Sequence, residues 1–174
     1  MSGEDGPILA TVIPIFNESK YIENCLNSLV KQTLDSSKHM ILVLDGNSTD
    51  DSVEIVERMI ETSKEINGPK ITLVNNPGKF VAEARNLALR ELPSSIKLMI
   101  ELIGHCTVPS DHLSKRLEVW EEISDESGSS IAGLGVRVLP SDGVKTMVET
   151  WIEATLSSSF GSGSGQFDKF TTTG

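Results

Sequence analysis

A carboxylate and an aromatic ring each stand at the end of an apolar run in this sequence. Asp45 directly follows the run Met40–Leu44, and Phe16 follows the run Leu9–Pro14 after one further residue. A carboxylate can accept a hydrogen bond from a base N–H or a ribose hydroxyl, and an aromatic face can cover a base. The two side chains therefore favour the binding of a nucleoside, although Asp45 also fits a simple turn and Asp50 a helix cap.

These residues lie where the elements of an open α/β sheet would present them. Ligands of such sheets bind at the carboxyl ends of the strands. The predicted strand ends carry the segments 14–18, 45–48, 75–78 and 104–105. No Gly-x-Gly-x-x-Gly fingerprint follows the first strand, and the sequence contains no Walker-type loop. Dinucleotide and phosphate-loop sites are therefore excluded.

Apolar runs alternate along the chain with apolar residues at helical spacing. The runs do not alternate in polarity, which is typical of strands buried on both faces of a parallel sheet. We therefore predict an α/β fold with a mainly parallel sheet, helices on both faces and right-handed crossovers. The predicted strands span 9–14, 40–44, 71–74, 96–102 and 131–139, and the predicted helices span 21–30, 53–60, 80–89, 109–123 and 144–156.

Caps and composition divide the chain further. Ser19 is a candidate N-cap of the first helix, and Ser48, Thr49 and Asp50 are candidates for the second. We expect one α/β domain over residues 1–156. Residues 157–174 begin with a Ser/Gly-rich stretch and are expected to be a loop or tail leading into a further half that this chain lacks.

The charge of the chain restricts its partners. The formal net charge is −10, which repels nucleic acid and anionic lipid surfaces. The same charge disfavours a nucleotide diphosphate unless a divalent cation or a few basic residues offset it. Lys79 and Arg137 could contribute, but a solvated surface role is the more ordinary one for each. No stretch is long and apolar enough to span a membrane.

The two cysteines, Cys25 and Cys106, match no metal-ligand spacing. Cys25 lies on the apolar stripe of the first helix and is predicted to be a small buried hydrophobe. A reduced, cytoplasmic setting follows as the expectation. Any association with a membrane would come from a part outside this chain.

Three motifs occur in an order that resembles family 2 glycosyltransferases. They are Val12–Glu18, Asp45–Asp50 and Ala84–Asn86. The run Gly104–Leu113 is similar to the branch that includes succinoglycan-type exopolysaccharide enzymes, and Phe160–Gly163 resembles a glycine loop of that branch. The resemblance implies a Rossmann-like fold of the GT-A type, found in nucleotide-diphospho-sugar transferases.

The resemblance also implies a set of site residues. Those at nucleotide-binding positions are Pro14, Phe16, Asn17, Glu18, Asp45, Gly46 and Arg85. Family members bind Mg²⁺ or Mn²⁺ through a carboxylate at the end of the fourth strand, where this sequence has Ile103. Residues two apart share a face of an extended strand, so Glu101 and His105 are the candidate metal ligands in place of Ile103. The alternative is that Glu101 is a surface charge and that His105 only hydrogen-bonds to a neighbouring ligand group.

No residue of the chain matches the family's general base, so no catalytic residue is assigned. The expected function is transfer of a sugar, with inversion, from a nucleotide-diphosphate donor to a saccharide or lipid-linked acceptor. The alternative is a non-catalytic nucleotide-sugar-binding module or an inactive fragment. A signalling receiver of the flavodoxin-like class is disfavoured, because no acidic cluster follows the first strand and no lysine follows the fifth.

Overall fold

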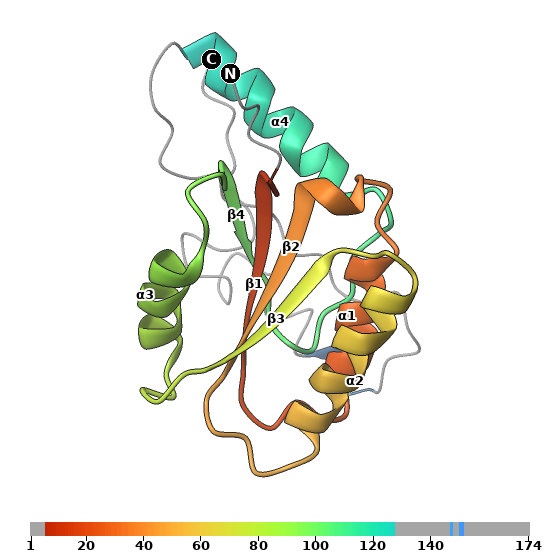
Figure 1. Cartoon of the computed structure of the whole chain (residues 1–174), viewed down its shortest axis with the longest axis vertical. Coiled ribbons are helices and arrows are strands. Elements are labelled where there is room, and N and C mark those ends of the chain that lie inside the picture. Colours follow the sequence, from red (N-terminus) through yellow and green to blue (C-terminus); the bar gives the residue numbers. More distant parts are fainter. Residues whose placement is uncertain (1–5, 128–146, 148–149, 152–174) are drawn as a thin grey trace. The chain divides into compact units, whose positions relative to one another are not determined.

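A parallel four-stranded sheet forms the centre of the protein. The computed structural model describes residues 6–127, 147 and 150–151. The strands are β1 (Leu9–Ile15), β2 (His39–Asp45), β3 (Lys70–Asn75) and β4 (Leu98–Glu101), in the order β3-β2-β1-β4 (Figure 1). The helices are α1 (Ile22–Val30), α2 (Ser52–Glu65), α3 (Val81–Glu91) and α4 (His112–Ser127), with a short 3₁₀ helix, η1, at Ser36–Lys38.

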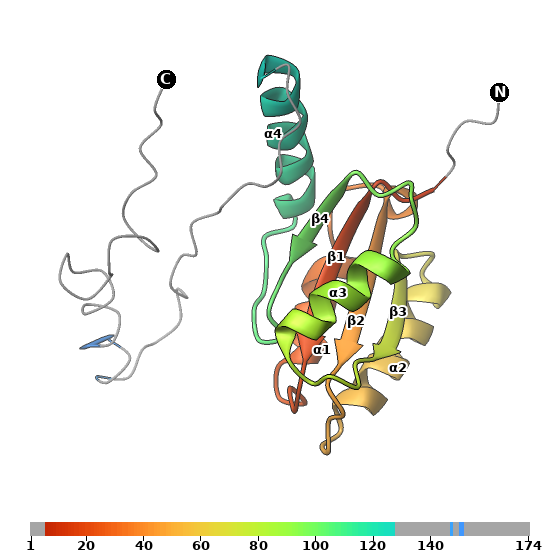
Figure 2. The ribbon, with the colours of Figure 1, turned by 90° about the vertical axis from the view of Figure 1, so that its left-hand side faces the viewer.

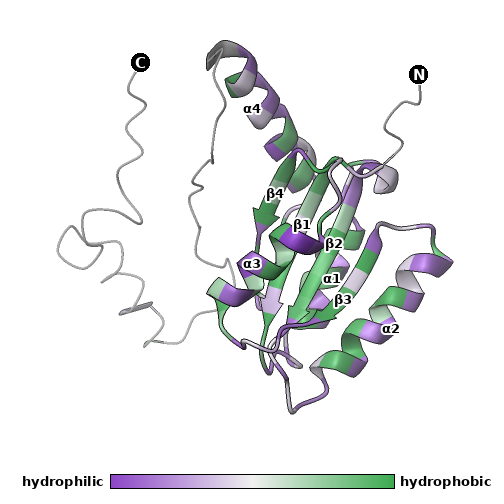
Figure 3. Ribbon diagram, turned by 60° about the vertical axis from the view of Figure 1, so that its left-hand side comes forward, coloured by the Kyte–Doolittle hydropathy of each residue, from purple (hydrophilic) through white to green (hydrophobic). Residues whose placement is uncertain are grey.

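Both faces of the sheet are covered by helices. Alternate residues of β1 and β2 point to opposite faces, as the period of a strand requires. One face packs against α1, α2 and α4, and its buried strand residues are Leu9, Ile13, Ile15, Ile41, Val43 and Ile71. The other packs against Ala84 and Ala88 of α3, through Val12, Leu42 and Leu44. Figure 2 shows α3 on one side of the sheet with α1 and α2 on the other, and Figure 3 shows the strands as the most apolar elements.

This two-sided burial explains why the strands read as unbroken apolar runs. Each fully buried Leu, Ile or Val side chain stabilises the fold by about 1.5–3 kcal/mol relative to exposure. The predicted α/β fold, with a mainly parallel sheet and helices on both faces, is confirmed for the described residues. The predicted strand 131–139 and tail 157–174 lie outside them, as do most residues of the predicted helix 144–156, of which Met147, Thr150 and Trp151 are helical.

The local prediction for the start of α1 is wrong. Ser19 does not cap the helix, which begins at Ile22 after Tyr21 and has no side-chain cap. The backbone N–H of Ser19 instead donates to the carboxylate of Asp50 at 3.1 Å. Ser19 therefore acts as a backbone donor to the Asp50 carboxylate in the loop before α2, and not as a side-chain cap of α1.

The register of the sheet brings three strand ends into one row. Ile15, Asp45 and Asn75 are paired across β1, β2 and β3. Strand β4 stops earlier, with Glu101 opposite Val12. Successive strands run from β1 outward to β3, and the chain then returns to the other side of β1. The crevice outside the carboxyl ends of β1 and β4 is therefore the topological switch point, where α/β sheets bind ligands.

The chain divides into two compact units, residues 1–129 and 130–174. The strands and helices named above belong to the first unit, and the three helical residues Met147, Thr150 and Trp151 belong to the second. Among the described residues, no helix has the length and apolarity needed to cross a bilayer.

A buried histidine stands at the amino end of β2. His39 is 2% exposed, and its Nε2 lies 2.9 Å from the hydroxyl of Thr11. Burial disfavours the charged imidazolium and lowers the pKa of His39 to about 4. The unfolded chain binds a proton at this residue below about pH 6.5, while the folded chain does not until about pH 4. Stability contributed by the neutral imidazole is therefore present above pH 6.5 and lost as the pH falls.

We predict that His39 reduces the free energy of unfolding by about 3 kcal/mol between pH 7 and pH 4. His39→Gln keeps a polar group near Thr11 but cannot titrate. Urea titrations of both proteins across this range should show a variant curve that falls less steeply with decreasing pH. Parallel pH curves for the two proteins would show that His39 has no such role.

Candidate functional site

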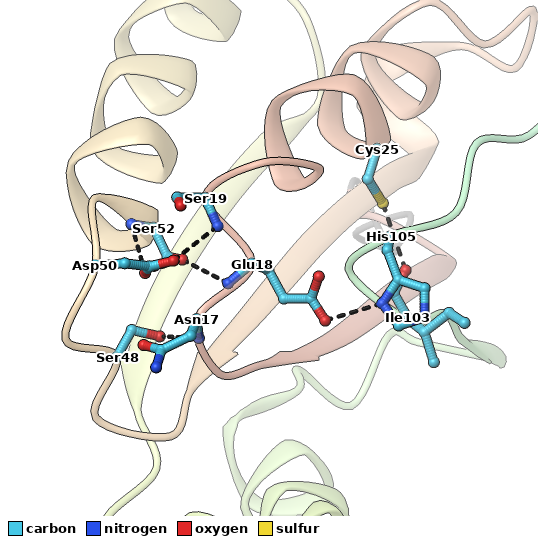
Figure 4. Close-up of polar contacts among 9 residues, drawn as sticks. All are labelled: Asn17, Glu18, Ser19, Cys25, Ser48, Asp50, Ser52, Ile103 and His105. Atoms are coloured by element: carbon cyan, nitrogen blue, oxygen red, sulfur yellow. Dashed lines mark hydrogen bonds and ion pairs between the residues drawn. The ribbon is translucent and has the colours of Figure 1, made fainter.

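Two loops at the carboxyl edge of the sheet are hydrogen-bonded to each other. The β1–α1 loop carries Asn17, whose backbone N–H donates to Ser48 Oγ at 2.9 Å and whose side-chain oxygen accepts from the Thr49 N–H at 2.8 Å. Asn17 has a φ of 57° and Asn47 a φ of 63°, a left-handed conformation that asparagine tolerates better than most residues. Figure 4 shows the two loops side by side.

Asp50 is the central hydrogen-bond acceptor between the two loops. Its carboxylate accepts from the N–H groups of Ser19 and Ser52, each at 3.1 Å, and from the Ser52 hydroxyl. The Ser52 oxygen in turn accepts from the Glu18 N–H at 2.8 Å. Burial opposes ionisation of Asp50, but the hydrogen bonds from Ser52 and Ser19 outweigh it and lower the pKa of the carboxyl to about 2. Asp50 is thus a structural anion of the loops, beyond a simple helix cap.

Asp45 closes the turn after β2. It is 6% exposed, and its two carboxylate oxygens lie 3.2 and 3.1 Å from the backbone N–H of Ser48. The neighbouring Gly46 donates its N–H to the Ile15 carbonyl at 2.9 Å. A Cβ on Gly46 would meet the carbonyl oxygen of Lys79 at 2.9 Å, so only glycine fits here. Asp45 therefore holds the turn after β2, and its contact with a nucleotide stays a prediction.

Phe16 and Lys79 are both exposed at this edge. The Phe16 ring is 50% exposed, and the Lys79 ammonium nitrogen lies 5.8 Å from its centroid, within cation–π range. Lys79 has a φ of 63°, a conformation that lysine rarely adopts. Its turn is held by the buried Asn76, whose side-chain nitrogen donates to the Phe80 carbonyl at 3.2 Å. Lys79 is exposed, as predicted, and its ammonium lies over the exposed Phe16 ring.

Arg85 extends from α3 to the end of β4. Its Nε and Nη2 donate to the two carboxylate oxygens of Glu101 at 2.7 and 2.8 Å. Hydrogen bonding and the charge of Glu101 raise the pKa of Arg85 above its usual value. Such a bidentate pair uses both oxygens of the carboxylate. Glu101 is therefore neither an unpaired surface charge nor an available metal ligand in this arrangement.

His105 contacts a different carboxylate. The expectation that Glu101, Ile103 and His105 share one face of an extended strand is wrong, because β4 ends at Glu101 and residues 104–105 form a turn. This turn places His105 Nδ1 2.9 Å from Glu18 Oε1. Gly104 permits the approach, since a Cβ there would meet Glu18 Cγ at 3.0 Å. The pair Glu18–His105 thus crosses the switch point between the ends of β1 and β4.

These contacts decide how well the edge fits a divalent cation. Mg²⁺ and Mn²⁺ prefer several oxygen ligands, usually including carboxylates. The side chain of Ile103 supplies none and is 55% exposed. The Glu101 carboxylate is ion-paired with Arg85, and the Glu18 carboxylate contacts the His105 ring. Within residues 6–127 and the described residues beyond them, no group of three or more His, Cys, Asp or Glu could hold a metal ion. The side chains as arranged do not fit the cation that the family resemblance implies.

Two further groups at this edge were not predicted together. Cys25 is buried on α1, as the sequence indicated, and its thiol lies 3.8 Å from the Ile103 carbonyl oxygen. Interaction with the Cys106 thiol and burial raise the pKa of Cys25, while the hydrogen bond from Cys25 lowers that of Cys106. The sequence offers no spacing signal for this pair, and only the β1–β4 neighbourhood in the sheet could have suggested it. The roles of Ser48 and Ser52 as acceptors for the β1–α1 loop were also not predicted, and the polar run 47–52 was the signal in the sequence that could have suggested them.

The fold and the polar loops at its carboxyl edge place the protein among ligand-binding α/β domains. The domain is a parallel α/β layer structure with polar loops gathered at a switch point. The comparison with known families is more specific: the family described as Glycosyl transferase family 2 matches residues 11–133. The chain belongs to this family.

Individual relatives are similar to part of this chain. A dolichyl N-acetyl-α-D-glucosaminyl phosphate 3-β-D-2,3-diacetamido-2,3-dideoxy-β-D-glucuronosyltransferase of Methanococcus voltae is 27% identical over 73% of this chain and 38% of its own length. The mannosyltransferase PcManGT of Pyrobaculum calidifontis, solved with GDP-Man and Mn²⁺, is 26% identical, with a TM-score of 0.58 over 65% of this chain and 32% of its own.

TarS of Staphylococcus aureus shares the fold at 24% identity, with a TM-score of 0.53 over 75% of this chain and 38% of the TarS chain. The present chain therefore spans about two fifths of the length of the curated relatives it matches first, 38% and 37%.

We predict that Asp50→Ala lowers the free energy of unfolding by about 1 kcal/mol or more, because it leaves two backbone N–H groups without their acceptor. Asp51→Ala is the matched control: Asp51 is exposed and makes no side-chain cap bond at the start of α2. Chemical denaturation at pH 7 measures both. Equal midpoints for the two variants would contradict the central role of Asp50.

Proposed function

We propose that this chain binds the nucleotide of a nucleotide-diphosphate sugar at the carboxyl edge of β1 and β2. In the protein to which it belongs, the sugar is transferred with inversion to a saccharide or lipid-linked acceptor. The observation that carries the proposal is the register of the sheet, which sets Asp45 beside Ile15, one residue before Phe16. The similarity to PcManGT, whose structure contains GDP-Man, supports the same kind of donor.

The side chains divide the task by their chemistry. The open face of Phe16 covers the base, and Asp45 accepts a hydrogen bond from the base or the ribose. Lys79 and Arg85 supply positive charge for the diphosphate, the group on which negative charge develops as the sugar leaves. Pro14, Asn17, Glu18 and Gly46 act by shaping the loops, as their backbone contacts support. No residue is assigned as the general base.

The acceptor class and the branch of the family are narrower proposals. The curated relative from Methanococcus voltae has a dolichyl sugar phosphate in its name, which supports a lipid-linked acceptor here. The run Gly104–Leu113 supports the succinoglycan-type branch through its resemblance alone. The division into a domain over 1–156 and a tail over 157–174 also remains a prediction.

A binding module without turnover is the second candidate, favoured by Ile103 and by the paired state of Glu101 and Glu18. Release of free nucleotide from a sugar donor separates the two. A transferase releases nucleotide when an acceptor is present, whereas a binding module is only stabilised by the donor.

We predict that saturating UDP, GDP or CDP raises the melting temperature, and that Phe16→Ala abolishes the rise. A ligand at 100 times its dissociation constant adds about 2.7 kcal/mol to stability, which corresponds to several degrees. Ile66→Ala is the control, since Ile66 is 59% exposed and follows the far end of α2. If none of the three nucleotides moves the midpoint of the unmodified chain, the donor-site proposal is wrong.

We also propose that nucleotide binding by this chain does not require a divalent cation. The reason is that the carboxylates at the switch point are already paired with Arg85 and His105. The family resemblance implies a metal-binding carboxylate at the position of Ile103, and PcManGT was solved with Mn²⁺. In this chain, the Lys79 ammonium over Phe16 supplies positive charge for the phosphates in place of the metal.

We predict that nucleotide raises the melting temperature of the unmodified chain equally in Mn²⁺ and in EDTA. For Ile103→Asp, we predict a larger rise in Mn²⁺ than in EDTA. Ile103→Asn is the matched control, because it has the size of aspartate without its charge. The side chain is 55% exposed, so all three proteins should fold. A manganese-enhanced shift in the unmodified chain, or none in Ile103→Asp, would overturn the proposal.

A further inference from the structure

The two cysteines of the chain meet beside the switch point. Cys25 lies on α1 and Cys106 follows β4, yet both approach one backbone oxygen. The Cys25 thiol lies 3.8 Å from the Ile103 carbonyl oxygen, and the Cys106 N–H donates to the same oxygen at 3.3 Å. The neighbouring thiol raises the pKa of Cys25 and lowers the pKa of Cys106. Figure 4 shows the Cys25 side chain directed at Ile103.

Their exposure differs in a useful way. Cys25 is fully buried in the core under α1, while Cys106 is half-buried. Cys106 packs against the core cluster that contains Cys25. An oxidant in solution therefore reaches Cys106 first, and the only thiol beside the oxidised sulfur is that of Cys25, because the chain contains two cysteines.

We propose that Cys25 and Cys106 form an oxidation-sensitive pair that closes to an intrachain disulfide on exposure to a hydroperoxide. The Cys106 thiolate attacks the peroxide O–O bond, giving a sulfenic acid and, with a proton, water or an alcohol. The Cys25 sulfur then attacks the sulfenic sulfur, and the hydroxyl leaves as water with the Cys25 proton. Two thiols and one hydroperoxide thus yield one disulfide, one water and one alcohol or second water.

The bond would join two parts of the site. Cys25 is rigidly placed on α1, and Cys106 is next to His105, which contacts Glu18. Cross-linking therefore ties the Ile103–Cys106 segment to the helix that follows the β1–α1 loop. This inference does not rest on the proposed function, since the chemistry involves only the two sulfurs.

The test is a thiol count on the whole chain. The reduced protein is treated with equimolar hydrogen peroxide, unfolded, and alkylated with a maleimide polymer that shifts the gel band once per thiol. We expect two shifts before oxidation, none after it, and two again after dithiothreitol. Mass spectrometry of the digest should find a peptide pair linked through Cys25 and Cys106.

Single variants assign the order of events. In Cys25→Ala, dimedone should trap a sulfenic acid at Cys106. In Cys106→Ala, the buried Cys25 should keep its thiol under the same treatment. The thiol count of the unmodified chain tests the disulfide proposal even if a variant fails to fold. Retention of both thiols, loss that dithiothreitol cannot reverse, or disulfides only between chains would each overturn the proposal, whatever the outcome of the nucleotide titration.

Discussion

Burial of β1 and β2 on both faces is the constraint on which the rest of the structure depends. It requires helices on each side, and parallel strands joined by helices must all end at the same edge. The register then fixes Ile15, Asp45 and Asn75 in one row. Every loop that follows these strands begins from that row, so the polar side chains of distant motifs are brought together by the packing of apolar ones.

This explains what could be predicted from the sequence. Continuous apolar runs identify strands buried on both faces, and the residues after them identify the carboxyl edge of the sheet, where Asp45 and Phe16 lie. The partners of each side chain were beyond such reasoning. Glu18 meets His105 across 87 positions, and Arg85 meets Glu101 across 16. These pairings depend on the crossing of the chain to the far side of β1, and on the early end of β4, neither of which leaves a local pattern.

Charged side chains at the edge are paired locally, although the chain as a whole is acidic. The net charge is −10, yet the Glu101 carboxylate is ion-paired with the Arg85 guanidinium, and the Glu18 carboxylate is within hydrogen-bond distance of the His105 ring. Lys79 is held over Phe16 by a left-handed turn that packs against Gly46. Local charge at the site is therefore set by these short-range contacts, since salt screens more distant exposed charges beyond roughly 10 Å.

The segment after β4 shows how the site works as one unit. Gly104 packs on Ile15 and Glu18, His105 meets Glu18, and the Ile103 carbonyl faces both Cys25 and Cys106. Apart from the Ile103–Cys106 hydrogen bond within the segment, these contacts reach β1, its loop or α1. Where a family member would position this segment around a cation, the present chain holds it through side chains of its first βα unit. A change in that unit, whether a substitution or a bond between sulfurs, must therefore act on the segment that follows β4.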